Sequence, residues 1–276
     1  MKIIRKYAYY LRSIFTMLFG VKQPLKLIAI FLHKDTPTLK TISLRTSGLT
    51  FQVRSKMDIW SLKETLLDHF YEKYGTPIQP TWTIMDIGAA IGEFTILATR
   101  SAPQGKVIAY EPYLGSFELL QTNLKINRIN NVTPYNQAIW STTGTLALDT
   151  TAGEPLQIVS TEPLAIPSST PTLDNSASPS PIRALSLADA LSTNHIAHLD
   201  LLKLDCEGAE YPILLQADPL IFHRIDRIVM EVHDNAHSHY HNELIELLHS
   251  QGYHTCLTPN PVHPHLGYLY AEKNKK

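Results

Sequence analysis

Residues 81–93 of the chain read TWTIMDIGAAIGE, an apolar run that ends in an acid and two spaced glycines. Its first part, up to Asp86, has the length and apolarity of a short buried strand. Gly88 and Gly92 let the turn after this strand approach a ligand closely, because a side chain there would block it. A helix that follows the turn directs its first N–H groups at the same ligand. The pattern predicts a strand–turn–helix binding loop, although it differs from the dinucleotide fingerprint G-x-G-x-x-G.

Alternation of strands and helices continues along the chain from this loop. Further strands are expected at 106–111, 132–139, 201–205 and 227–233, with helices around 94–98, 117–124, 210–216 and 244–248. Such alternation is typical of a parallel sheet covered by helices. Two closing strands, 253–258 and 266–272, read as a hairpin that adds one antiparallel strand. We therefore expect an α/β, Rossmann-like fold.

Two regions fall outside this alternation. Residues 1–75 are expected to form a helical and strand-bearing accessory segment, separated by Pro77 and Pro80 from an α/β domain over 76–276. Within it, a strand pair is expected over 41–54, turning at Ser47-Gly48, and a helix over 58–74. Residues 150–183 are rich in Pro, Ser and Thr, which predicts a solvated linker outside the core, with a lid as the alternative.

The first residues of the accessory segment are basic and amphipathic. Apolar side chains recur at three- and four-residue steps from Ile4 to Leu18, which predicts a helix with one apolar stripe. We expect this stripe to pack on the main domain. The alternative is that residues 1–32 contact an anionic membrane surface peripherally. Arg12 interrupts the apolar stretch, and no small-residue cleavage site follows, so neither a membrane span nor a signal peptide is expected.

Overall composition excludes some function classes. The formal net charge is −1, which gives no general attraction to nucleic acid. Two cysteines, Cys206 and Cys256, make no disulfide framework, in keeping with a cytoplasmic protein.

Acidic side chains gather where the expected strands end. Glu111 ends the second strand, 25 positions after Asp86, where a carboxylate can accept both ribose hydroxyls of an adenosine. Asp205 and Glu207 follow the fourth strand, and Glu231 and His233 end the fifth. In open α/β sheets ligands bind at this edge, so these groups form the candidate site.

Four stretches that carry these residues resemble the FkbM family of methyltransferases. They are DIGAAIGEFT, AYEPYLGSFELLQTNL, LLKLDCEGAE and IVMEVH, in the family's order and spacing. The resemblance covers about residues 58–272 apart from the insertion. It implies a class I methyltransferase fold, with a seven-stranded sheet containing one antiparallel strand. It also implies S-adenosylmethionine as methyl donor and O-methylation of a small-molecule hydroxyl, on a sugar or a secondary metabolite.

The resemblance also implies roles for individual residues. It puts Asp86, Gly88, Ala90 and Gly92 at the methionine end of the cofactor, Glu111 on the ribose and Ala138 near the adenine. Ala90 stands where the family often has Asn, which removes one polar contact.

Methyl transfer to a hydroxyl requires alignment and removal of one proton. Asp205 and His233 are the candidate bases, with His233 favoured because an imidazole titrates near neutrality. Glu207 and Glu231 are expected to orient these groups or to hold acceptor hydroxyls.

Two other activities remain open at this point. The His-rich segment 233–241 could serve a metal-dependent hydrolase, although its spacing fits no fixed zinc pattern. A nicotinamide-dependent oxidoreductase is the second alternative, and the missing third glycine argues against it. No dedicated metal site is predicted, but Asp205 and Glu231 offer oxygen ligands for a divalent metal that assists methyl transfer.

Overall fold

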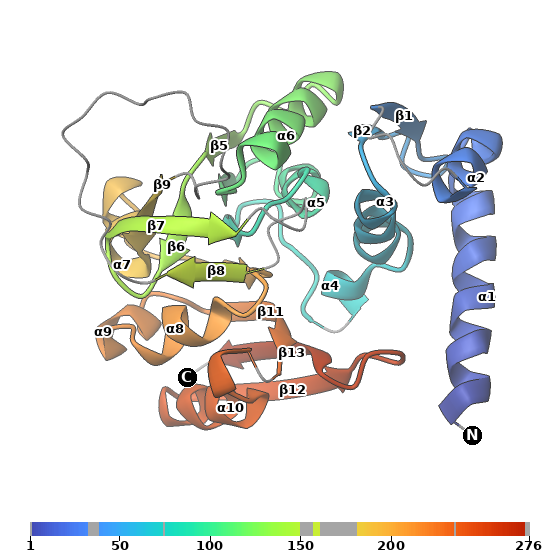
Figure 1. Ribbon diagram of the computed structural model, residues 1–276. Coiled ribbons are helices and arrows are strands. Elements are labelled where there is room, and N and C mark those ends of the chain that lie inside the picture. Colours follow the sequence, from blue (N-terminus) through green and yellow to red (C-terminus); the bar gives the residue numbers. More distant parts are fainter. Residues whose placement is uncertain are drawn as a thin grey trace, which may run out of the picture.

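A seven-stranded sheet forms the centre of the computed structural model (Figure 1), which describes residues 2–32, 39–73, 75–149, 157–160, 181–234 and 236–273. Its strands are β3 (Thr83–Ile87), β4 (Lys106–Tyr110), β5 (Val132–Tyr135), β10 (Leu201–Leu204), β11 (Arg227–His233), β12 (Tyr253–Pro259) and β13 (Leu266–Lys273). Their order is β12-β13-β11-β10-β3-β4-β5. Only β13 runs antiparallel to its neighbours, β11 and β12. The predicted fold class is confirmed, including the closing hairpin.

Helices cover both faces of this sheet. They are α5 (Glu93–Ser101), α6 (Leu114–Ile126), α7 (Leu187–Thr193), α8 (Glu210–Leu215), α9 (Pro219–Phe222) and α10 (His241–Ser250), with a 3-10 turn at Ala236–Ser238. Alternate residues of a strand face opposite layers. Accordingly Met85 packs in the cluster formed with α7 to α10, whereas its neighbour Ile84 packs against Phe94 of α5. This layering leaves the carboxyl ends of β3, β4 and β10 at one edge.

The N-terminal segment packs against the sheet domain. It comprises α1 (Lys2–Gly20), α2 (Pro24–Leu32), β1 (Lys40–Ser43), β2 (Thr50–Val53), α3 (Lys56–Leu62), a π-helical turn (Lys63–Leu67) and α4 (Phe70–Lys73). The expected strand pair is confirmed, with Gly48 in its turn at φ +70°. Asn123 of α6 accepts the Gln52 N–H at 2.7 Å, which fastens β2 to the domain. The division at residue 75 stays a prediction.

The prediction of a single helix over 58–74 is wrong, because α3, the π-helical turn and α4 occupy this range instead. The α-helix is interrupted at Lys63, whose ammonium group is buried. This side chain is 1 % exposed and pairs with Asp68 at 2.7 Å. Its ammonium also lies over the rings of Tyr9 and Trp60. His69 then adopts φ +55°, which ends helical geometry before α4. Tyr74 lies outside the described residues.

A second sheet, which the sequence analysis did not predict, has the order β6-β9-β7-β8. Its strands are β6 (Ala138–Trp140), β7 (Gly144–Asp149), β8 (Gln157–Ser160) and β9 (Pro181–Ser186). The strand expected over 132–139 is split, since β5 joins the large sheet and β6 this one. The linker expected over 150–183 is wrong for 157–160 and for 181–183, because β8 and β9 pair with β7. Residues 150–156 and 161–180 lie outside the description.

Helix α1 forms as predicted, but most of the described part of its apolar stripe does not pack on the domain, Leu18 being the exception. Among its described side chains, the buried ones are Ser13 and Met17, whereas Leu11 is 58 % and Phe15 52 % exposed. The helix docks through the opposite face, where the Tyr9 hydroxyl donates to Glu64 at 3.0 Å. Among the helices of the described chain, none is both long and apolar enough to cross a membrane.

Candidate functional site

The turn between β3 and α5 lies against the turn that follows β10. Gly88 has φ +76°, and a Cβ on it would lie 1.9 Å from the Asp205 carbonyl oxygen. Only glycine fits there, since any side chain would meet backbone that has no room to move. Gly92 also has a positive φ, +93°, and its missing Cβ makes room for Leu120. Ala90 adopts φ +47° between the two glycines.

Asp86 lies behind this turn rather than in the pocket. It is fully buried, with Oδ1 3.0 Å from the Lys203 ammonium and Oδ2 accepting the Thr95 hydroxyl. The same ammonium donates to the Gly88 carbonyl oxygen at 2.7 Å. Burial alone would lower the pKa of Lys203, but the carboxylates of Asp86, Asp205 and Glu93 together raise it. Lys203, which the sequence analysis overlooked in the buried run LLKL, therefore holds the turn in place as a cation.

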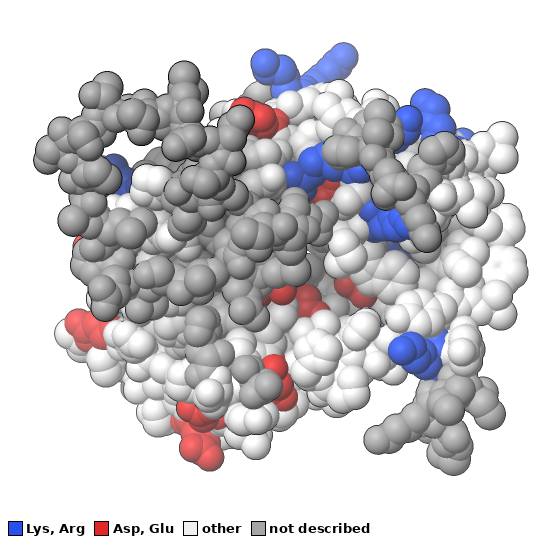
Figure 2. All heavy atoms as spheres, viewed as in Figure 1, with Lys and Arg blue, Asp and Glu red and all other residues white. Residues whose placement is uncertain are grey.

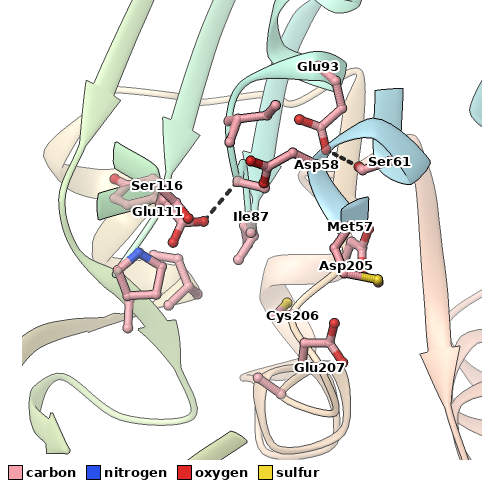
Figure 3. Close-up of a pocket in the computed structure, with 18 of the residues that line it drawn as sticks. Met57, Asp58, Ser61, Ile87, Glu93, Glu111, Ser116, Asp205, Cys206 and Glu207 are labelled. Atoms are coloured by element: carbon pink, nitrogen blue, oxygen red, sulfur yellow. Dashed lines mark hydrogen bonds between the residues drawn. The ribbon is translucent and has the colours of Figure 1, made fainter. Parts of the chain in front are cut away.

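A pocket opens at the carboxyl ends of β3, β4 and β10, where the strand order changes direction (Figure 3). Its lining includes Gly88, Ala90, Glu111, Ala138, Asp205 and Glu207, six of the predicted site residues. Asp86, Gly92, Glu231 and His233 are not among its lining residues. Topological switch points of this kind are where open α/β sheets bind ligands.

Glu111 reaches the pocket from the end of β4. Its Oε2 accepts the Ala90 N–H at 2.8 Å and its Oε1 accepts the Tyr113 N–H at 2.9 Å. Burial raises the pKa of this carboxyl to about 7, against the lowering effect of the two N–H donors. The group thus connects the turns after β3 and β4 while it faces the cavity.

The N-terminal segment supplies one wall of the pocket, which the sequence analysis missed. This wall consists of Arg54, Met57, Asp58 and Ser61. Ser55 and Asp58 form a capping box at the start of α3, and Arg54 pairs with Asp58 at 3.1 Å. The box follows the pattern S-x-x-D/E, which locates a helix start but gives no sign that the helix borders a pocket.

Glu93, also missed, lies where this wall meets α5. It is buried, and the Ser61 hydroxyl donates to its Oε1 (Figure 3). Oε2 has no hydrogen-bond partner within the described residues. Burial raises the pKa of Glu93 to about 7. Glu93 thus places a buried carboxyl, with one oxygen unpaired and shielded from solvent, at the lining of the pocket.

The turn after β10 borders the pocket from the opposite side. Glu207 and Gly208 both have positive φ, +53° and +99°, and the Cys206 N–H donates to Glu210 at 2.7 Å. Positive φ at a non-glycine residue is a strained geometry that concentrates at functional sites. Burial raises the pKa of the Cys206 thiol, which argues against a thiolate nucleophile.

His233 and Glu231 lie beside Asp205 at the end of β11. One ligand atom from each of the three residues lies within 4.8 Å of the others. His233 also lies 3.4 Å from Glu207 and 3.4 Å from the buried Glu210. Burial alone would lower the pKa of His233, but Glu210, Glu207 and Asp205 raise it to about 10. This ring is therefore an imidazolium at neutral pH.

Asp205 and Glu231 differ in their partners. The Tyr71 hydroxyl donates to Asp205 Oδ2 at 2.8 Å. The carboxyl of Glu231 is largely buried, and burial together with the neighbouring Asp205 raises its pKa well above the ordinary value. Asp205 alone of these two lines the pocket.

Histidines of the 233–241 segment do not converge. His239 pairs with Glu243 at 2.8 Å and His241 with Asp234 at 2.7 Å, while His233 faces the turn after β10. The side chain of His237 lies outside the described residues. Each described ring thus has a different acid as partner, which does not favour the metal-hydrolase alternative.

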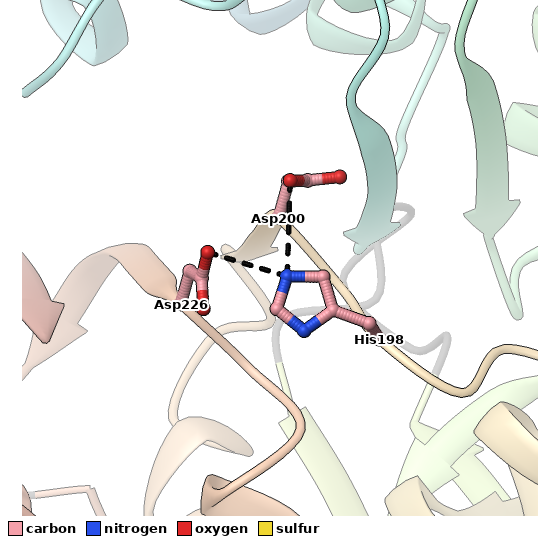
Figure 4. A group of neighbouring side chains, drawn as sticks. All are labelled: His198, Asp200 and Asp226. Carbon is pink, nitrogen blue, oxygen red and sulfur yellow. Dashed lines mark ion pairs between the residues drawn. The ribbon is translucent and has the colours of Figure 1, made fainter. Parts of the chain in front are cut away.

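Another His/Asp group lies at the amino ends of β10 and β11, the edge opposite the pocket (Figure 4). His198 lies 3.2 Å from Asp226 and 3.8 Å from Asp200. Asp200 also accepts the Thr83 N–H at 2.7 Å, and Asp226 has Arg227 3.7 Å away. Because these acids already have protein partners, we interpret the group as a surface ion-pair cluster rather than a metal site.

Fold and pocket together define a Rossmann-like α/β protein with a small-molecule site at its switch point. The model of the methyltransferase FkbM domain matches residues 86–255. The chain belongs to this family of methyltransferases.

Individual relatives are more distant. Methyltransferase sdnD of Sordaria araneosa is 26 % identical over 218 residues, which cover 71 % of this chain and 82 % of that protein. The 31-O-demethyl-FK506 methyltransferase FkbM of Streptomyces tacrolimicus is 23 % identical over 246 residues, with 81 % and 92 % covered. The crystal structure of methyltransferase FkbM from Methylobacillus flagellatus KT has a TM-score of 0.47 at 15 % identity, covering 77 % of this chain and 53 % of that one.

Proposed function

We propose that the chain is an S-adenosylmethionine-dependent methyltransferase that methylates a hydroxyl of a sugar or secondary metabolite. Family membership supports methyl transfer. The observation that carries the choice of cofactor is the charge of the pocket. Its lining contains five acids, namely Asp58, Glu93, Glu111, Asp205 and Glu207, and one cation, Arg54.

An acid-lined pocket of this kind fits S-adenosylmethionine, whose sulfonium and ammonium groups are cationic. The carboxylates of Glu93 and Glu111, which both line the pocket, are acceptors for an ammonium and for ribose hydroxyls respectively. A nicotinamide dinucleotide would instead bring an anionic pyrophosphate against the same acids. The charge of the lining therefore argues against the oxidoreductase alternative.

Within this proposal, different pocket residues contact different parts of the cofactor. Glu111 receives the ribose, and Ala138 borders the adenine side. Gly88 and Ala90 bring backbone close to the ligand, and Glu93 receives the amino end. Asp86 acts indirectly, because its ion pair with the Lys203 ammonium fixes the turn from behind.

The cofactor supplies an electrophilic methyl group, and the protein must align the acceptor oxygen with it and take up one proton. Asp205 is the base in this proposal, because it alone of the two candidates lines the pocket. His233 carries a proton at neutral pH and cannot accept another, so the expectation that favoured it is revised. Its positive charge instead stabilises the carboxylates around it.

Two observations support the choice of acceptor class. A relative is named for methyl transfer to an oxygen of FK506, which favours a hydroxyl of a secondary metabolite. Carboxylates such as Glu207 accept hydrogen bonds from hydroxyl groups, as a polyhydroxylated acceptor would require.

Cofactor choice is tested by calorimetry of the purified chain with S-adenosylmethionine, S-adenosylhomocysteine and NAD⁺. We expect saturable binding of the first two and none of NAD⁺. Tighter binding of NAD⁺ than of either sulfur compound would overturn the proposal.

The proton acceptor is tested with Asp205→Asn and His233→Gln, assayed with a competent hydroxylated acceptor. Loss of a general base lowers turnover about a hundred- to ten-thousand-fold. We expect this for Asp205→Asn, with cofactor affinity nearly unchanged, and a smaller loss for His233→Gln. The opposite ranking would assign the base to His233. EDTA tests the divalent-metal alternative at Asp205 and Glu231, and unchanged turnover is expected because the positive charge of His233, within 4.8 Å of both carboxylates, would repel a divalent cation.

A further inference from the structure

Two N-terminal helices, α1 and α2, present apolar side chains to solvent on one side. In α1 the exposed residues are Tyr7, Leu11, Ile14, Phe15 and Phe19, at 70, 58, 49, 52 and 73 %. Their spacing of three, four or one places them on one stripe of the helix. We call these five residues, together with Leu25, Ile28 and Leu32 of α2, the α1–α2 face.

The stripe of α1 is exposed because the domain already contacts the opposite side of the helix. Ser13 and Met17 are buried at 2 and 3 %, one helical turn apart. One turn before Ser13, Tyr9 hydrogen-bonds Glu64. Gly20, at the end of the helix, also belongs to this contact, because a Cβ at this position would lie only 2.6 Å from the Leu67 side chain. Rotating the helix to bury the stripe would break all of these contacts.

Helix α2 repeats the arrangement. Leu25, Ile28 and Leu32 are 80, 40 and 75 % exposed, whereas Leu27 on the other side is buried at 4 %. Nine of the fourteen exposed large hydrophobic side chains in the described chain lie between Tyr7 and Leu39. Single exposed apolar residues are normal on a protein surface, but a concentration of this kind marks an interaction site.

Charge identifies the partner. Residues 2–32 contain no acid and six bases: Lys2, Arg5, Lys6, Arg12, Lys22 and Lys26. Lys6, Arg12, Lys22 and Lys26 are exposed. In the view of Figure 2, Lys and Arg lie mainly along the top and toward the upper right, while most of the Asp and Glu lie toward the lower left and in the central hollow. Apolar stripes flanked only by bases are typical of helices that lie in the interface of anionic membranes.

We propose that the α1–α2 face docks the protein on an anionic lipid surface. The exposed apolar side chains enter the boundary between headgroups and acyl chains, and the bases bind lipid phosphates. A second copy of the chain is a poorer partner, because it would bring the same bases face to face. The helices lie on the surface without crossing it, since four bases interrupt the 19 residues of α1.

Docking in this way would bring the pocket close to the membrane. Helix α3 carries Met57 and Ser61 into the pocket lining, and Trp60 of the same helix contacts Tyr10 of α1. The inference rests on exposure and charge of α1 and α2 alone, and does not require the proposed cofactor.

Co-sedimentation of the full chain with vesicles tests the proposal. Vesicles of phosphatidylcholine with 30 % phosphatidylserine are compared with pure phosphatidylcholine at physiological salt. We expect binding to the mixed vesicles and little to the neutral ones. Leu25→Glu should weaken binding about tenfold or more, because burying a leucine contributes about 1.5–3 kcal/mol. Lys26→Gln should weaken it about fivefold, the value of one surface cation.

Leu220→Glu is the matched control, since Leu220 is 69 % exposed on α9, away from the α1–α2 face. Circular dichroism checks that all variants are folded. The proposal fails if wild type does not bind the anionic vesicles, or if Leu25→Glu and Leu220→Glu bind alike. Light scattering adds a third criterion: a dimer in solution that Phe15→Glu with Phe19→Glu dissociates would assign the face to a second copy instead.

Discussion

Replacing Glu111 by glutamine tests how the pocket binds its cofactor. Both carboxylate oxygens accept backbone N–H groups, from Ala90 at 2.8 Å and Tyr113 at 2.9 Å. The amide keeps one acceptor, but its NH₂ group faces the second N–H donor. A hydrogen bond to a charged group contributes about 1.5–3 kcal/mol, so the Kd for S-adenosylmethionine should rise about 10- to 150-fold. One unpaired N–H should also destabilise the fold by about 1–3 kcal/mol, or roughly 2–12 °C in Tm.

Calorimetry with S-adenosylmethionine and thermal denaturation of the same samples measure the two effects. Glu118→Gln is the control, because Glu118 lies exposed on α6, seven residues further along the chain. We expect it to leave both affinity and Tm unchanged. If Glu111→Gln lowers Tm but binds the cofactor as wild type does, Glu111 only connects two turns and its assignment to the ribose is refuted.

Three further predictions follow from the turn after β3 and its surroundings. Gly88→Ala should destabilise the fold by several kcal/mol in thermal denaturation, because its Cβ would lie 1.9 Å from a carbonyl oxygen, whereas Gly48→Ala, at φ +70° with open space, should cost only about 1–2 kcal/mol of backbone strain. Lys203→Met should cost about 3–5 kcal/mol in chemical denaturation, because it leaves the buried Asp86 unpaired, and adding Asp86→Asn should restore part of the loss; additive effects would contradict the pairing. Affinity for S-adenosylmethionine should rise about tenfold between pH 5.5 and 7, as carboxyls with a pKa of about 7 ionise for a cationic ligand, and Glu93→Gln should flatten this dependence in calorimetry.

Much of the sheet was predictable because its signals are local. Buried strands such as 227–233 are short, largely apolar runs followed by turn residues, and this stretch forms β11 over the same residues. The binding loop was equally predictable from the sequence, since Gly88 and Gly92 mark positions where the backbone adopts a positive φ. Strand-end position alone brought Glu111 and Asp205 to one pocket, because parallel strands end at the same edge.

Long-range packing explains what the sequence could not provide. The wall formed by Arg54 to Ser61 borders the pocket only because α6 holds β2 and α3 against the domain, through pairs such as Asn123 with Gln52. The apolar stripe of α1 was assigned to the core, since periodicity shows that a stripe exists but not what lies beside it. The protonation state of a side chain also depends on long-range packing. An isolated imidazole titrates near neutrality, but three carboxylates of the segment 205–210 keep His233 protonated.

Charge also explains how one edge of the sheet can hold so many acids. Its two fixed cations, Lys203 and His233, both lie outside the pocket lining, where they pair with carboxylates from behind. They stabilise the turns after β3 and β10 without occupying the cavity. Burial meanwhile raises the pKa of Glu93 and Glu111 to about 7, so these two acids are partly protonated at neutral pH. A cationic ligand would reverse this, since a positive charge at contact distance favours the ionised form. We infer that cofactor binding itself sets the final charge of the pocket, and that release of protons on binding is its measurable consequence.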